Sequence, residues 1–121
     1  MDRKPSEIIT EFLNFLEISE QKYETAYEDV GKEDNKLQTF LHDMEFASNK
    51  SERNKIATRL QQSRKTRRKA KDCTQLYEKI HNFYTEKQNS NPLKALRRLQ
   101  NEQITMEKYL FGNREFKNRV E

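Results

Sequence analysis

The apolar residues near the start of the chain recur at helical spacing. From Ser6 onwards they follow at intervals of three, four and seven residues, the spacing of one helical face turned to a core. Ser6 is placed to cap this helix and Glu7 falls in its first turn. Gly31 can adopt positive φ and is expected to end it. The apolar set is Ile8, Ile9, Phe12, Leu13, Leu16, Tyr23, Ala26, Tyr27 and Val30.

Two more helices are predicted between residues 37 and 88. A short one is expected around residues 37–44, and the stretch SNKS at 48–51 reads as its connection to the next. A helix that starts at Ser51 can continue to about Gln88, because no Gly or Pro intervenes. Its seam alternates in steps of four and three, as in a coiled coil, so that each seam residue faces a neighbouring helix. The seam is Ile56, Leu60, Ser63, Arg67, Ala70, Thr74, Tyr77, His81 and Tyr84.

A last helix is predicted to follow the stretch NSNP at 89–92. Pro92 suits its first turn and Gly112 is expected to end it. The apolar side of this helix is expected to face the core, with Leu93, Leu96, Leu99, Ile104, Met106, Leu110 and Phe111. Residues 113–121 are expected to form a loosely docked or mobile tail. The pattern predicts an all-α fold, an elongated bundle of about four helices with one long basic coiled-coil-like helix, as a single domain over 1–121.

Composition supports exposed helices over a compact sheet. Hydrophobic residues make up 32% and charged residues 36% of the chain, against about 45–50% and about 25% in ordinary globular domains. Two glycines and two prolines provide little material for tight β-turns. Intrinsic disorder is the alternative, and seven Phe and five Tyr count against it because they supply large anchors at helical spacing.

Charge is distributed very unevenly along the chain. Residues 1–45 hold 12 acids and 5 bases, and residues 50–71 hold 10 bases and the single acid Glu52. The middle segment therefore carries +9 beside an acidic segment of −7, although the net charge of the whole chain is only +4. This asymmetry is the strongest functional signal in the sequence.

The basic segment is dense enough to predict anion binding. Arg64, Arg68 and Lys71 lie at i, i+4 and i+7 with Arg53 near the same meridian, and they form one stripe without interspersed acids. Such a stripe favours the phosphates of a nucleic acid, since each neutralised phosphate releases counterions. Lys65 and Lys69 lie on another side and Arg67 on the seam. The candidate anion-binding residues are Arg53, Arg59, Arg64, Lys65, Arg67, Arg68, Lys69 and Lys71.

Two alternatives explain the basic segment without a binding partner. The acidic first helix can neutralise the basic helix within the chain, or the basic residues can form a solvated face without a partner. Single-strand binding is disfavoured, because the chain has no Trp and no aromatic residue between Phe46 and Tyr77 to stack on bases. The backbone of a nucleic-acid duplex or an acidic protein surface remains as the expected ligand of the stripe.

Catalysis and cofactor binding find little support in the sequence. Cys73 is the only cysteine, so no intramolecular disulfide and no cysteine-based zinc site is expected. His42 and His81 fall on different predicted helices, which makes a metal site improbable, and no glycine-rich phosphate loop occurs. We expect that the protein is not an enzyme and binds no metal ion and no cofactor. The start MDRKPSEIITEFLNF lacks a signal-peptide pattern and no run of 18 apolar residues occurs, so a cytoplasmic protein is expected.

Two stretches carry a resemblance to a known group. They are YETAYEDVGKEDNKLQTFLHDMEF at 23–46 and RNKIATRLQQSRKTRRKAKD at 53–72. Together they resemble small all-helical accessory proteins of phages and prophages of Gram-positive bacteria. The resemblance implies an accessory protein that acts in a bacterial host cytoplasm by binding host or phage machinery, and it transfers no site residue.

The sequence thus predicts a non-enzymatic binding protein that presents a basic helical stripe to a polyanion, preferably duplex nucleic acid or a nucleoprotein. The rival hypothesis is a phage-type inhibitor or anti-defence protein that blocks a host enzyme by direct contact. In that case the acidic face of the first helix can imitate DNA phosphates. The length of the third helix adds the expectation of either an elongated shape or a homodimer paired along the polar middle of its seam.

Overall fold

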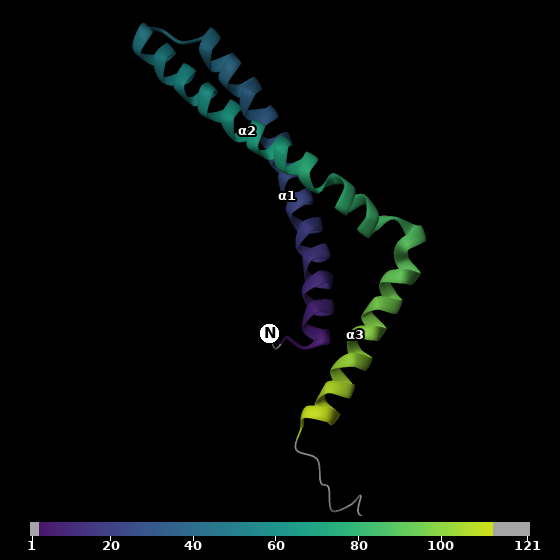
Figure 1. Cartoon of the computed structure of the whole chain (residues 1–121). Coiled ribbons are helices and arrows are strands. Elements are labelled where there is room, and N and C mark those ends of the chain that lie inside the picture. The colour runs from purple at the N-terminus through teal and green to yellow at the C-terminus, as the bar shows by residue number, and fades with distance from the viewer. Residues whose placement is uncertain (1–2, 113–121) are drawn as a thin grey trace, which may run out of the picture. The chain divides into compact units, whose positions relative to one another are not determined.

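The chain is all-helical throughout residues 3–112, the part that the computed structural model describes. Helix α1 spans Pro5–Glu45, α2 spans Lys50–Thr85, the short 3₁₀ helix η1 spans Lys87–Asn89 and α3 spans Ser90–Phe111 (Figure 1). The predicted all-α class is confirmed. The described residues form three long helices in place of the four predicted, and the coiled coil is not confirmed. The predicted tail at 113–121 lies outside the described residues.

The predicted helix break at Gly31 is wrong. Helix α1 continues through this residue, and Gly31 does not adopt positive φ. A glycine inside a helix costs only about 1 kcal/mol relative to alanine. The next turn holds Glu33 and Asp34, both of which bond to side chains of α2. These contacts depend on an unbroken helix, and the short helix expected around residues 37–44 is therefore the last part of α1.

The start of α1 is capped differently from the prediction. Helix α1 begins with Pro5 at a position that suits proline, and the Lys4 N–H donates to the Glu7 carboxylate at 2.9 Å. Ser6 is not the cap, since its N–H and hydroxyl both donate to the carboxylate of Glu107 on α3. The N-terminus of α1 is thus held by two carboxylates, which also complement the helix dipole.

Helix α2 starts with a reciprocal cap. Asn49 Oδ1 accepts the Glu52 N–H at 2.9 Å, and the Glu52 carboxylate accepts the Ser48 N–H at 2.9 Å. The arrangement resembles a capping box with Asn49 as the cap, except that Glu52 accepts the N–H of Ser48, the residue before the cap, and not that of Asn49. It starts the helix at Lys50, one residue before the predicted start.

Helix α3 ends at Phe111, as the sequence predicts, and Gly112 is its C-cap. A Cβ atom at Gly112 would lie 2.3 Å from the Lys108 carbonyl oxygen. A residue with a Cβ atom could adopt this backbone conformation only if the backbone shifted, so glycine suits the end of the helix.

The described residues divide into two compact units. One comprises Ser19–His81, and the other comprises the residues up to Ile18 together with those from Asn82 onwards. We call them the hairpin unit and the terminal unit. Helix α1 contributes to both units.

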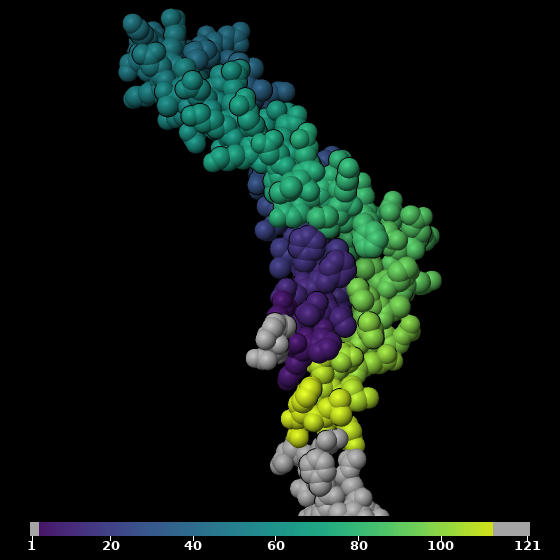
Figure 2. All heavy atoms as spheres, in the orientation of Figure 1, coloured from purple at the N-terminus to yellow at the C-terminus, as the bar shows by residue number. Residues whose placement is uncertain are grey.

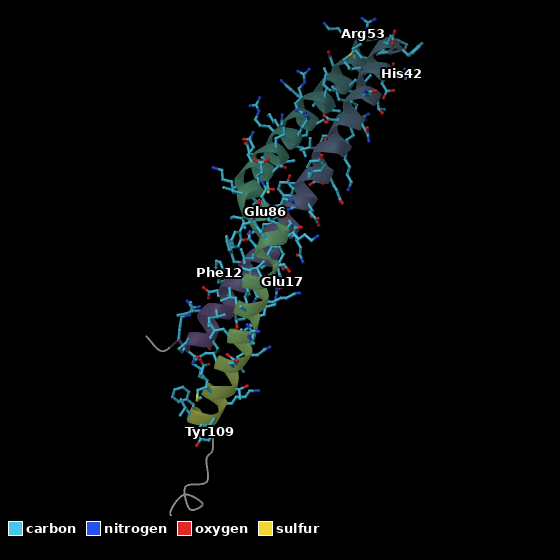
Figure 3. All side chains as sticks on the ribbon, turned by 90° about the vertical axis from the view of Figure 1, so that its right-hand side faces the viewer. Phe12, Glu17, His42, Arg53, Glu86 and Tyr109 are labelled. Atoms are coloured by element: carbon cyan, nitrogen blue, oxygen red, sulfur yellow. The ribbon has the colours of Figure 1, made fainter. Side chains whose placement is uncertain are left out.

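The hairpin unit packs α1 and α2 against each other in antiparallel fashion. The Ser63 hydroxyl donates to Glu33 at 2.7 Å, and the His81 ring stacks on Tyr23 with ring centroids 3.9 Å apart. In Figures 1 and 3 the second part of α1 and the teal part of α2 run side by side. All nine predicted seam residues of α2 are buried or half-buried. Because α1 covers the seam at residues 63–81, the expected pairing of two copies along it has no free surface there.

The terminal unit pairs the first part of α1 with α3. Gln100 donates to Thr10 Oγ1 at 2.8 Å, and the Ser6 to Glu107 bonds lie further along, so the two helices run antiparallel. The buried apolar side chains of this unit are Leu13, Leu16 and Leu93. Other residues that the pattern assigns to the core remain exposed, which corrects the prediction for both helices: Ile8, Phe12, Leu99, Met106, Leu110 and Phe111.

Candidate anion-binding surface on α2

The centre of the candidate surface is a row of three cations on α2. Arg64, Arg68 and Lys71 are exposed and lie at i, i+4 and i+7 along the helix; we call them the basic stripe. They span a rise of about 10 Å. Figure 3 shows nitrogen-tipped side chains that project from the side of α2 turned away from α1. The row is therefore open to a ligand along its length.

The cations of the stripe make no ion pair in the described part of the chain. Within residues 3–112, no hydrogen bond or ion pair involves the side chains of Arg64, Arg68 or Lys71. Like charges at i,i+4 repel by a few tenths of a kcal/mol per pair. A bound anion would remove this repulsion, which makes the stripe electrostatically prepared for a negatively charged partner.

Arg67 belongs to the helix packing and not to the open surface. Its Nε donates to Asp34 Oδ1 at 2.6 Å, and both side chains are partly covered. This bond crosses from α2 to α1 inside the hairpin unit. The predicted role of Arg67 in anion binding thus competes with a structural ion pair, and we leave it out of the stripe.

The other four predicted residues lie around the stripe at varying distance. Lys65 and Lys69 are exposed and lie one helical turn apart on another side of α2. Arg53 is exposed in the second turn of α2, eleven residues before Arg64, and is labelled in Figure 3. Arg59 lines a separate hollow with Asp43 and Glu52, near the connection between α1 and α2. Lys65 and Lys69 can strengthen the field of the stripe, whereas Arg59 stands apart from it.

Two acids of α1 bond to groups other than the predicted cations. Glu33 bonds to Ser63 and Lys36, and Glu20 bonds to His81. The Ser63 hydroxyl holds the pKa of Glu33 below its ordinary value against the opposing effect of burial, and Lys36 adds to the lowering. Among the described residues, Asp34 with Arg67 is the one ion pair between α1 and the eight predicted cations. Neutralisation by the acidic helix is therefore seen at one position.

A hollow lies beside Lys71, at the C-terminal end of the stripe. It has a volume of about 320 Å³ and lies between α1 and α2. The side chain that Gly31 lacks would meet no atom within 4 Å, so the glycine itself helps to open it. Sequence reasoning missed this feature because it treated Gly31 as a helix end. Its lining residues are Tyr27, Val30, Gly31, Asp34, Lys71, Thr74 and Gln75.

The described residues contain no candidate metal site and no candidate membrane-spanning helix. Among residues 3–112, no group of three or more His, Cys, Asp or Glu side chains is arranged to hold a metal ion. His42 lies against Phe46 with ring centroids 4.8 Å apart, and Cys73 is half-buried in the hairpin unit. In the same part of the chain, no helix combines the length and apolar character needed to cross a membrane.

The comparisons with known proteins add no relative. No protein-family model, no curated protein and no solved structure matches the chain. The resemblance to phage accessory proteins thus stays a prediction.

Proposed function

We propose that this chain is a non-enzymatic binding protein that presents the basic stripe to the phosphate backbone of duplex nucleic acid, in the cytoplasm of a bacterial host. The observation that carries the proposal is the exposed row of Arg64, Arg68 and Lys71, none of which forms an ion pair within residues 3–112. The row rises by about 10 Å, and a duplex passes about six phosphates over that length. Contacts of this kind position a protein on the duplex without reading its sequence.

The type of cation also supports phosphate as the ligand. Two of the three stripe residues are arginines, whose planar guanidinium groups can donate two parallel hydrogen bonds to one phosphate. Lys65 and Lys69 add charge nearby and attract the duplex at longer range. A stack of bases needs aromatic platforms, and the stripe has none among its neighbours on α2 between residues 53 and 71.

The experiment is fluorescence anisotropy of a labelled duplex of about 20 base pairs, titrated with the protein at several salt concentrations. Three engaged phosphates predict a slope of about −3 in a plot of log K against log salt concentration. The variant Arg64→Glu with Arg68→Glu should abolish binding and leave the helicity unchanged. Binding that survives this double reversal contradicts the proposal.

A matched control separates the stripe from net charge. Lys94 and Arg98 on α3 are also exposed bases at i and i+4. The variant Lys94→Glu with Arg98→Glu changes the net charge by the same amount. It should lower the affinity only slightly, and an equal loss in both variants would show that net charge and not the stripe attracts the duplex.

The hollow beside Lys71 favours a second candidate, a protein inhibitor that binds a host enzyme directly. A groove of about 320 Å³ with Tyr27, Val30 and Thr74 in its wall can receive an apolar side chain. The adjacent stripe would then contact acidic groups of the same partner. A pull-down from nuclease-treated bacterial lysate tests this reading. Capture that is lost in Gly31→Met, which fills the groove, and no binding to free duplex would favour the inhibitor.

A further inference from the structure

The first part of α1 carries a row of large apolar side chains that α3 does not cover. Ile8, Phe12 and Phe15 lie at i, i+4 and i+7, and each is between 45% and 52% exposed. Leu13 and Leu16, on the neighbouring side of the helix, are buried. Helix α1 is thus apolar over a wider arc than a single neighbouring helix can bury.

Helix α3 carries a second row of the same kind. Leu99, Met106 and Leu110 lie at i, i+7 and i+11, and each is again between 45% and 51% exposed. Leu93 on the adjacent side is buried. We call the two rows together the apolar face, which consists of Ile8, Phe12, Phe15, Leu99, Met106 and Leu110.

The two rows lie on the same side of the helix pair. On each helix, the exposed row lies about 100° around the helix axis from the buried side, and the direction of this rotation is the same when each helix is viewed along its own chain direction. Because the two helices run antiparallel, the same direction of rotation places both rows on one side of the helix pair. The other side of the pair is partly polar, with a hollow lined by Glu7, Ile104 and Lys108. Figure 2 shows side chains with aromatic rings on the visible face of the purple segment, beside α3.

The apolar face contains no charge. The remaining residues in the same arc of the two helices are Pro5, Pro92, Ala95 and Gln103. Charged residues make up 36% of the whole chain, so an arc of this length without one is unusual for a solvated surface. An uncharged face offers no electrostatic complementarity to a charged partner. It can pack against the same face of a second copy, because no like charges meet there.

From these observations we infer that two copies of the chain associate through the apolar face of the terminal unit. Six half-exposed side chains of this size present on the order of 500 Å² per copy, which is as large as the largest apolar patch of a typical monomer, and such patches often bind a partner. Two such faces bury on the order of 1,000 Å² together, near the lower end of specific interfaces. A twofold axis brings the same patch of both copies together. The two helix pairs then form an antiparallel four-helix arrangement in which each row faces apolar side chains.

The decisive measurement is the mass of the full chain in solution, by sedimentation equilibrium over a wide range of concentration. We expect a mass of twice 14.7 kDa at high concentration and a dimer to monomer transition on dilution. The variant Phe12→Glu with Met106→Glu puts two charges in each face and should weaken the dimer at least a hundredfold. A wild-type chain that stays monomeric at all concentrations overturns the inference.

The control variant places the same two charges on exposed apolar residues elsewhere. Leu41 and Leu76 are 54% and 70% exposed and lie in the hairpin unit. Leu41→Glu with Leu76→Glu should leave the dimer intact. A dimer that resists the substitutions in the apolar face, or that is lost equally in the control, contradicts the assignment of the interface.

Cysteine cross-linking covers the case in which the face variant loses helicity. In a Cys73→Ser background, Met106→Cys lies in the apolar face and Lys108→Cys lies on the other side of α3. A bifunctional maleimide that spans about 10 Å, the distance between packed helices, should link two copies through the first cysteine and not through the second. Equal linkage at both positions overturns the inference.

Discussion

Glu33 of α1 accepts a hydrogen bond from the hydroxyl of Ser63 on α2, with 2.7 Å between Oε1 and Oγ, and both side chains are buried. The second carboxylate oxygen accepts a bond from Lys36 at 3.2 Å. A buried carboxylate is stable only with such partners. The pair lies in the polar middle of the α2 seam, where apolar packing is sparse, and it therefore fixes how the two helices of the hairpin unit meet.

Replacement of Ser63 by alanine should destabilise the protein. Ser63→Ala removes the donor and leaves one oxygen of a buried carboxylate without its partner, which costs about 1.5–3 kcal/mol. Urea unfolding followed by circular dichroism measures the change in the free energy of unfolding. Ser51→Ala, at an exposed serine of the same helix, is the control and should stay within about 0.5 kcal/mol of wild type. Equal values for the two variants would show that the bond to Glu33 contributes little.

Stability should fall at acid pH because of two buried carboxylates. The Ser63 hydroxyl lowers the pKa of Glu33 from its ordinary value of 4.5. Burial raises the pKa of Glu107, but the bonds from Ser6 and Gln103 outweigh it, so this pKa also lies below 4.5. A carboxyl group with a lowered pKa stabilises the folded state above pH 4.5, and this contribution is lost as the pH falls through the folded-state pKa.

The pH dependence can be measured as the thermal unfolding midpoint from about pH 6 down to about pH 2.5. Wild type should lose stability progressively below pH 4.5. The variant Glu33→Gln with Glu107→Gln should begin with a lower midpoint and show a flatter curve. Glu24→Gln removes an exposed carboxylate of α1 without touching either hydrogen bond, and serves as the control. A double variant with the wild-type slope would place the acid sensitivity elsewhere.

The sequence predicts the seam of α2 well, the buried faces of α1 and α3 only in part, and the contacts between distant residues poorly. The seam of α2 follows from a local period, and all nine of its residues are covered. The bonds of Glu33 to Ser63 and of Ser6 to Glu107 join residues 30 and 101 positions apart, and no local pattern indicates them. The open cations of the basic stripe were predictable because acids are missing from the local sequence. The ion pair of Arg67 with Asp34 was not predictable, because it depends on which helix lies opposite α2.

The continuity of α1 at Gly31 leads to a stability prediction. Gly31 lies inside the helix, its φ is not positive, and an added Cβ would meet no atom within 4 Å. Gly31→Ala should therefore stabilise the protein by about 0.5–1 kcal/mol, through a smaller entropy loss on folding. Ala57→Gly, at an exposed position of α2, is the mirror-image control and should destabilise by a similar amount. If α1 instead ended at Gly31 with positive φ, Gly31→Ala would destabilise.

A second buried serine, Ser19, tests how much an unpaired buried hydroxyl changes the free energy of unfolding. Ser19 of α1 is 1% exposed, and its Oγ has no hydrogen-bond partner among the described residues. An unpaired buried hydroxyl costs about 1–3 kcal/mol. Ser19→Ala removes it and creates only a small cavity, so we expect an increase of about 1 kcal/mol in the free energy of unfolding.

The two serine variants are best compared in one urea series. Ser19→Ala and Ser63→Ala delete the same atom from a buried position, but only Ser63 bonds to a carboxylate. The expected signs are therefore opposite, with Ser19→Ala stabilising and Ser63→Ala destabilising. The same substitution at both sites cancels differences in helix propensity and side-chain volume. If Ser19→Ala destabilises as strongly as Ser63→Ala, its hydroxyl has a partner in solution, and the packing around Ser19 needs a different explanation.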